Sequence, residues 1–166
     1  MNRDNVCCFT GHRIIRQTDI GILPQRLDEI IEKLYKNGVT DYICGGALGF
    51  DTIAAKAVLK LRSVYPDIRL HLALPCLEQD KNWKSADREV YRHILDSADD
   101  ITYVSQVEYY DGCMQKRNRY MIEKSAHCVF YMTINRGGTH YTVRYALENE
   151  LHMYNILRGP LKIIHG

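Results

Sequence analysis

The stretch Cys44-Gly45-Gly46-Ala47-Leu48-Gly49-Phe50-Asp51 lies between a short apolar run and a helical pattern. The run Tyr42-Ile43-Cys44 is typical of the end of a buried strand, and apolar residues from Ile53 to Leu61 recur at helical spacing. We therefore predict a strand-to-helix turn. Because glycine has no Cβ atom, such a turn can adopt positive φ and bring backbone N–H groups close to a ligand. The N-terminus of the following helix also favours negative charge.

Two interpretations of this turn are open. In the first, Gly45, Gly46 and Gly49 form a cradle for an anion or a nucleotide phosphate, and Asp51 accepts hydrogen bonds from ribose hydroxyls. In the second, the glycines only make a tight turn and Asp51 only caps the helix. The spacing matches neither the dinucleotide fingerprint G-x-G-x-x-G nor the lysine-bearing P-loop, so neither motif is assigned.

Length and composition indicate one globular domain over residues 1–166. The chain is 46% hydrophobic and 25% charged, and a chain of this length buries about 70% of its unfolded surface around a single core. Its 22 basic and 20 acidic residues leave a net charge of +2. Proteins that bind long nucleic acids usually carry a clear excess of basic residues, which this chain lacks, so nucleic acid is not an expected partner.

The sequence favours a cytoplasmic protein. No apolar run is long enough to cross a membrane, and residues 1–5 lack the apolar region of a signal peptide. The six cysteines include no C-x-x-C pair, so we expect reduced core thiols rather than disulfides. The seven histidines show no H-x-x-x-H spacing, and we expect neither a protein-built metal site nor a cofactor.

Strand-like and helix-like segments alternate along the chain. The predicted strands are Val6–Phe9, Tyr42–Cys44, Ile68–Leu74, Ile101–Val104, His127–Thr133 and Leu161–Ile164. The predicted helices are Leu23–Leu34, Thr52–Val64, Ser85–Leu95, Met114–Lys124 and Tyr141–Met153. Such alternation predicts an α/β fold with a parallel sheet covered on both faces. Ligands of such sheets bind outside the carboxyl ends of the strands, where the strand order reverses.

Several polar segments fall at that edge. Thr10-Gly11-His12-Arg13 offers a hydroxyl, backbone donors, an imidazole and a guanidinium that can bind phosphate through two hydrogen bonds. Alternatively, Arg13 pairs with a surface carboxylate and His12 is merely solvated. His12 could also act as a general acid or base, but no nucleophile is evident beside it.

Three further features are candidates for the site. Trp83, the single tryptophan, lies in a polar stretch and either stacks on a base or anchors a loop. The basic cluster Lys116-Arg117-Asn118-Arg119 opens a helix, so at most two of its four side chains can face a cleft. Gly137-Gly138-Thr139 is another glycine turn, either a plain one or one that supplies a hydroxyl and backbone donors.

In combination, five segments resemble the YpsA-like branch of the SLOG superfamily over nearly the whole chain. They are Phe9–Arg13, Gly45–Asp51 with Ala47 inside it, Leu74–Trp83 with Gln79, Met114–Asn118 and Gly137–Thr139. The resemblance implies a single Rossmann-like, three-layer α/β/α domain that binds a nucleotide or a nucleotide-derived ligand. It does not specify an activity.

Two related groups suggest alternatives. LOG phosphoribohydrolases cleave a base from a ribose phosphate with an arginine and a glutamate, and Arg117 and Gly137–Thr139 look similar to their motifs. Tyr141 and Thr142, however, stand where that glutamate is expected, so Asp51 or His12 would have to substitute for it. The other group is DprA, a single-stranded DNA-binding protein, whose turns resemble Gly11–Arg13 and Gly45–Asp51.

From these features we predict a sensor or binding module for a small nucleotide-derived ligand such as an ADP-ribose-like molecule. A LOG-like N-glycosidase and DprA-like DNA binding are the alternatives, and a homo-oligomer is compatible with the sequence. Arg13 and Arg117 would hold phosphate, Asp51 would bind ribose, and Gln79 or Trp83 would contact the base. The expected site residues are Thr10, Gly11, His12, Arg13, Gly45, Gly46, Ala47, Gly49, Asp51, Gln79, Trp83, Arg117, Asn118, Gly137, Gly138 and Thr139.

Overall fold

The computed structural model describes residues 1–157 together with the backbone of residues 163–164. The strands are β1 (Val6–Gly11), β2 (Asp41–Cys44), β3 (Arg69–Leu74), β4 (Asp100–Tyr103), β5 (His127–Tyr131), β6 (His152–Asn155) and β7 (Ile163–Ile164). The α-helices are α1 (Gln17–Ile20), α2 (Leu23–Lys36), α3 (Phe50–Arg62), α4 (Ser85–Ser97), α5 (Cys113–Glu123) and α6 (Gly137–Glu148). A 3-10 turn, Arg3–Asn5, precedes β1.

The strands form one sheet in the order β4-β3-β2-β1-β5-β6-β7. Strands β1 to β6 pair in parallel, and β7 pairs antiparallel to β6. The chain builds outward from β1 to β4 and then returns to place β5 on the other side of β1. The strand order therefore reverses between β1 and β5, which is where doubly wound sheets bind their ligands.

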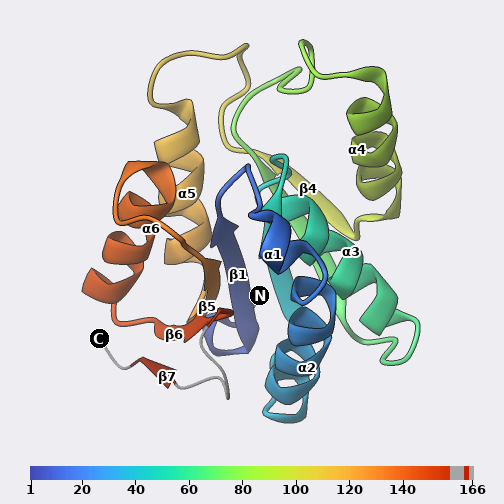
Figure 1. Ribbon diagram of the computed structural model, residues 1–166, viewed down its shortest axis with the longest axis vertical. Helices are drawn as coiled ribbons and strands as arrows, with labels where there is room; N and C mark the ends of the chain where they lie inside the picture. Colours follow the sequence, from blue (N-terminus) through green and yellow to red (C-terminus); the bar gives the residue numbers. More distant parts are fainter. Residues whose placement is uncertain (158–162, 165–166) are drawn as a thin grey trace.

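Helices cover both faces of the sheet (Figure 1): α2, α3 and α4 pack on one face, and α5 and α6 on the other. Alternate strand residues point to opposite faces because a strand has a period of two. Phe9 and Tyr42 thus join the core under α2 and α3, whereas Cys8 and Ile43 join the core under α5 and α6. The predicted α/β fold with two covered faces is confirmed.

The predicted apolar stripe of the first long helix is also confirmed. Its members, Leu23, Leu27, Ile30, Ile31 and Leu34, are all buried on α2. All six cysteines are buried free thiols, as expected for core positions. No helix among the described residues has the length and apolar character needed to cross a membrane.

The C-terminal part of the prediction was wrong. The segment expected as one helix over Tyr141–Met153 divides into α6, which ends at Glu148, and the strand β6, His152–Asn155. The helix stops because Glu150 adopts a positive φ of 59°. Beyond it, Met153 and Tyr154 are buried on opposite faces of the sheet. Of the expected strand Leu161–Ile164, the last two residues form β7, and the first two lie outside the described residues.

The first strand is longer than expected. It continues through Thr10 to Gly11, which lies in register with Tyr131 of β5. The short helix α1, which the sequence did not indicate, follows it. Asp19 of α1 is buried and accepts a hydrogen bond of 2.6 Å from the hydroxyl of Tyr131. This contact ties the loop after β1 to the neighbouring strand at the point of strand reversal.

Candidate functional site

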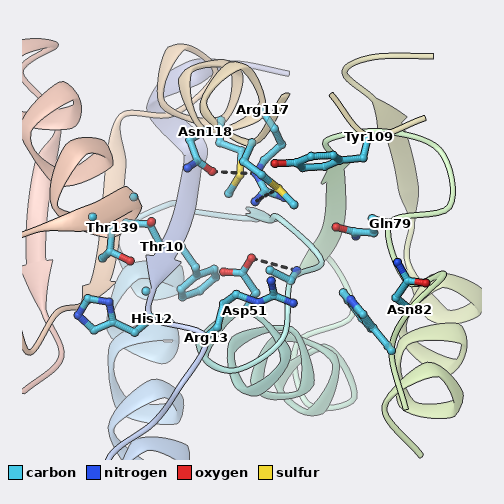
Figure 2. Close-up of a pocket in the computed structure, with 18 of the residues that line it drawn as sticks. Thr10, His12, Arg13, Asp51, Gln79, Asn82, Tyr109, Arg117, Asn118 and Thr139 are labelled. Carbon is cyan, nitrogen blue, oxygen red and sulfur yellow. Dashed lines mark hydrogen bonds between the residues drawn. The ribbon is translucent and has the colours of Figure 1, made fainter. Parts of the chain in front are cut away.

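A cavity of about 910 Å³ opens at the carboxyl edge of the sheet, and the loops after the first five strands line it. Thirteen of the sixteen expected site residues lie on its wall: Thr10, Gly11, His12, Arg13, Ala47, Asp51, Gln79, Trp83, Arg117, Asn118, Gly137, Gly138 and Thr139. Figure 2 shows Thr10, His12 and Thr139 on one side of the cavity, Gln79 and Asn82 on the other, and Arg13 and Asp51 between them.

The segment after β1 reaches the cavity with one basic side chain unpaired. Within the described residues, the guanidinium of Arg13 forms no hydrogen bond and no ion pair, and the side chain is exposed on the cavity wall. The neighbouring His12 is held differently, because its Nε2 atom accepts a hydrogen bond of 2.9 Å from the backbone N–H of Thr133. Partial burial lowers the pKa of His12. Both observations favour a neutral imidazole that links the ends of β1 and β5.

Asp51 brings a buried carboxylate to the cavity. It lies in the first turn of α3, and its Oδ2 atom accepts a hydrogen bond of 3.2 Å from the backbone N–H of Ala47. Burial raises the pKa of this carboxyl group, while the charges of Arg117 and Arg13 act in the opposite direction. Asp51 therefore orders the glycine-rich turn itself, and it does so from a position that also faces the cavity.

Arg117 is buried and largely occupied by bonds inside the protein. Its Nη1 atom donates to the carbonyl oxygens of Gly45 and Ala73, at the ends of β2 and β3. Its Nε atom donates to Asn118 Oδ1 at 2.8 Å, and Nη2 lies 3.8 Å from Met114 Sδ. Four of the five N–H donors of a guanidinium are thus used, which leaves one N–H on Nη2 for a ligand.

The three glycines before α3 do not line the cavity, contrary to the expected close approach to a ligand. Gly49 has φ +80°, and a Cβ atom there would come within 2.1 Å of the carbonyl oxygen of Arg13. At Gly45, a Cβ atom would lie 2.6 Å from Arg117 Nη1 and 2.7 Å from Asp51 Oδ2. The missing side chains make room for the protein's own loop and charged groups. At Gly46, a Cβ atom would lie 2.6 Å from the side chain of Leu74 at the end of β3.

The start of α6 presents a different kind of glycine turn. Nothing lies within 4 Å of the Cβ positions of Gly137 and Gly138, so these residues leave open space beside the helix. Within the described residues, no side chain caps the N-terminus of α6, and its N-cap residue is Arg136. The first-turn N–H groups and the hydroxyl of Thr139 are therefore placed where an anion could accept hydrogen bonds from them.

The wall opposite α6 carries Gln79 and Trp83. Trp83 is half-buried, and its ring packs edge-to-face on Tyr91, with 5.1 Å between the ring centroids. Gln79 Nε2 donates to the carbonyl oxygen of Gly46 at 3.2 Å and to the hydroxyl of Tyr91 at 3.0 Å. Trp83 therefore anchors its loop, one of the two roles considered for it, and it also lines the cavity; stacking on a base stays a prediction.

The basic cluster at the start of α5 divides as helical geometry requires. Arg117 and Asn118 line the cavity, whereas Lys116 and Arg119 are exposed. Arg119 instead lies over the ring of Tyr141, 5.6 Å from its centroid. The expectation that at most two of the four side chains face a cleft is confirmed.

Sequence reasoning missed several residues of the cavity wall. The loops after β3, β4 and β5 also contribute Leu77, Glu78, Lys81, Asn82, Glu108, Tyr109, Ile134 and Arg136. The signal that could have found them was their place in loops that follow parallel strands, because all such loops meet at one edge of the sheet. Among the described residues, no group of three or more His, Cys, Asp or Glu side chains could hold a metal ion.

The parallel sheet, the reversal of strand order beside β1 and the cavity at that point define a Rossmann-like α/β domain. The chain belongs to the YspA SLOG family (YpsA), whose profile matches residues 8–158. It is 32% identical over 152 residues to a UPF0398 protein of Bacillus cereus strain G9842, covering 87% of this chain and 82% of that protein. It is 33% identical over 141 residues to the uncharacterized SPbeta prophage-derived protein YoqJ of Bacillus subtilis strain 168, covering 78% and 82%.

Two solved structures of DNA processing protein A share the fold. The Helicobacter pylori protein, described for its single-stranded DNA binding mode, superposes with a TM-score of 0.63 at 20% identity, covering 92% of this chain and 65% of that one. The Streptococcus pneumoniae protein superposes with a TM-score of 0.65 at 15% identity, covering 90% and 49%. The chain thus spans about two thirds and about half of these neighbours, and the likeness concerns the fold alone.

Proposed function

We propose that the cavity binds a small nucleotide-derived ligand, with phosphate beside Arg13 and the start of α6 and the base beside Gln79 and Trp83. The observation that carries this proposal is the meeting of segments far apart in the sequence, Thr10–Arg13, Ala47 with Asp51, and Gly137–Thr139, around one cavity at the point of strand reversal. Nucleotides bind other doubly wound sheets at the same place.

The charges around the cavity support an anionic group at one end. The guanidinium of Arg13 forms no hydrogen bond or ion pair among the described residues, and the first turn of α6 has no side-chain cap. A phosphate placed between them would gain charge-assisted hydrogen bonds from a guanidinium and from backbone N–H groups. Arg136, next to that turn, adds a second exposed cation to the same side of the cavity wall.

The size of the cavity supports a ligand larger than a mononucleotide. Its volume of about 910 Å³ lies near the upper end of the range of about 300–1,000 Å³ for small-molecule sites. An ADP-ribose-like molecule, with two phosphates between two sugars, would extend from the α6 side toward Gln79. All six cysteines are free thiols, which supports a location in a reducing compartment such as the cytoplasm.

We propose binding without turnover, as in a sensor. The positions where LOG enzymes place their glutamate hold Tyr141, which contacts Arg119, and Thr142, whose hydroxyl donates to the carbonyl oxygen of Gly138. An N-glycosidase is the second candidate, because Asp51 is a buried carboxylate on the cavity wall whose pKa is raised by burial, a common feature of catalytic acids.

Isothermal titration with ADP-ribose, AMP, adenosine and an oligothymidylate tests the proposal. We expect ADP-ribose or AMP to bind with a Kd below about 1 mM, and adenosine to bind more weakly because it lacks phosphate. The oligothymidylate should bind weakly, since Asp51, Glu78 and Glu108 offset the basic side chains of the cavity wall. Strong, salt-dependent oligonucleotide binding with no response to any small nucleotide would overturn the proposal in favour of the DNA-binding alternative.

A further inference from the structure

The side-chain amide of Gln79, on the cavity wall, is fixed in one orientation. Its Nε2 atom donates to the carbonyl oxygen of Gly46 at 3.2 Å and to the hydroxyl of Tyr91 at 3.0 Å. A backbone carbonyl can only accept, so the amide nitrogen, and not the oxygen, must face Gly46. The orientation of the Gln79 amide is therefore set by the main chain of the glycine-rich turn.

The remaining atom of this amide has no partner. Gln79 Oε1 is shielded from solvent and accepts no hydrogen bond; among the described residues it shares this condition only with His140 Nδ1. Leaving such an acceptor unpaired costs free energy, and few buried polar groups in native structures lack a partner. Figure 2 shows Gln79 across the cavity from Thr10 and His12, with its amide oxygen on the side of the group that lies nearer to Asp51.

The amide is also held against rotation. Tyr91 of α4 is buried, and burial raises the pKa of its hydroxyl to about 12, so that it stays protonated and available to Gln79. Trp83 packs edge-to-face on the ring of Tyr91. A cavity wall that holds the unpaired acceptor Gln79 Oε1 in a fixed position favours a ligand with a hydrogen-bond donor at that point.

We infer that the ligand's base carries an exocyclic amino group, as adenine and cytosine do, and that one of its N–H bonds donates to Gln79 Oε1. The inference rests on the proposed function, because it assigns the base end of the same cavity. Gln79 is then a specificity-determining residue. It favours an amino-bearing base over one with a carbonyl or a hydrogen at that position, because either replacement leaves the buried acceptor unpaired.

Two matched ligand pairs test this on the wild-type protein by isothermal titration. The first is AMP against purine riboside 5′-monophosphate, which has the same ring and phosphate but no exocyclic amino group. The second is CMP against the corresponding pyrimidin-2-one nucleotide. Of AMP and CMP, we expect the one that binds better to bind at least about tenfold more tightly than its own analogue without the amino group. A factor of this size corresponds to one hydrogen bond to a buried acceptor.

The outcomes separate the two proposals. Equal affinities within each pair, with clear binding, would overturn the role of Gln79 and leave the proposed function standing. No binding of any nucleotide would overturn both. A preference for UMP over CMP together with IMP over AMP would also overturn the inference, because those bases carry a carbonyl where the parents carry the amino group.

The variant Gln79→Leu tests directly whether this side chain selects the base. We expect its affinity for AMP to fall about tenfold, to that of the amino-free analogue, while the ratio between AMP and adenosine stays unchanged because the phosphate end is intact. Gln25→Leu on α2, an exposed glutamine that does not line the cavity, is the matched control and should bind like the wild type. If Gln79→Leu is too unstable, Tyr91→Phe removes one of the two anchors of the amide and should reduce the selectivity within each pair. Unchanged selectivity in a folded Gln79→Leu protein would refute the assignment.

Discussion

The Nη1 atom of Arg117 donates a hydrogen bond to the carbonyl oxygen of Gly45, a residue 72 positions earlier in the chain. The same atom also donates to Ala73, so one buried guanidinium ties α5 to the carboxyl ends of β2 and β3. This contact explains why Gly45 has no room for a side chain. It also makes the floor of the cavity depend on an internal cation.

Replacing Arg117 should therefore destabilise the fold. Arg117→Met leaves the buried carboxylate of Asp51 without its main counter-charge, and we expect the free energy of unfolding to fall by about 3–5 kcal/mol. Arg117→Lys keeps the charge but cannot span the two carbonyl oxygens, and we expect a smaller loss of about 1.5–3 kcal/mol. Urea unfolding measures both. Lys116→Met, an exposed neighbour on the same helix, should change stability by less than about 0.5 kcal/mol; equal losses for all three variants would contradict the buried role.

Gly49→Ala should lower the free energy of unfolding by more than the positive φ of residue 49 alone explains. Gly112 also has positive φ, +95°, but nothing lies within 4 Å of its Cβ position. Gly112→Ala should therefore cost about 1–2 kcal/mol for the left-handed conformation. Gly49→Ala adds a clash at 2.1 Å with the backbone of Arg13 and should be clearly less stable in the same urea titration. Similar losses for the two variants would mean that the Arg13 segment moves away without cost.

Arg13→Ala should weaken ligands that carry phosphate more than ligands that do not. Arg13 is exposed on the cavity wall, and its guanidinium forms no hydrogen bond or ion pair among the described residues. Its removal should therefore weaken the binding of AMP by about 1.5–3 kcal/mol more than it weakens the binding of adenosine. Isothermal titration of the two ligands gives the difference. Arg92→Ala, an exposed arginine on α4, is the control. Equal losses for AMP and adenosine would place the phosphate elsewhere.

The wild-type protein should leave AMP intact, and free adenine should not accumulate above the uncatalysed background in a chromatographic assay run over hours. Release of adenine that Asp51→Asn abolishes, while the variant keeps its fold and still binds AMP, would make the N-glycosidase the better description. Asp51 is the residue to change because it is the buried carboxylate of the cavity wall.

His12 should make stability depend on pH. Its pKa in the folded protein lies below the usual value of about 6.5 because of burial. Between those two pKa values the unfolded chain binds more protons, so the free energy of unfolding rises with pH. The stabilisation by neutral His12 is thus present above about pH 6.5 and is lost as the pH falls below it. Urea unfolding of wild type and His12→Asn at pH 7.5 and 5.5 should show a larger difference at pH 7.5; a constant difference would argue against a shifted pKa.

Much of the fold follows from local patterns in the sequence. The stripe from Leu23 to Leu34 placed α2, and the apolar run ending at Cys44 placed β2 before the glycine turn. Strand β6 was missed because Met153 and Tyr154 continue an apolar pattern that also suits a helix. Only the turn at Glu150, with its positive φ, separates the two elements. A short strand of this kind is selected by pairing with β5, which is a tertiary interaction.

The sequence by itself determined that glycine-rich and polar segments follow buried strands, and hence that they would meet at one edge of a parallel sheet. It could not determine which way each group faces, because that depends on partners distant in the chain. Tertiary structure turned the glycines before α3 toward Arg13, Arg117 and Leu74, and left those at the start of α6 beside open space. It also occupied four of the five N–H donors of Arg117 with two main-chain carbonyls and two side chains, whereas the guanidinium of Arg13 forms no hydrogen bond or ion pair with any residue that the structure describes. Two similar arginines thus differ because burial forces one to find partners inside the protein and exposure does not.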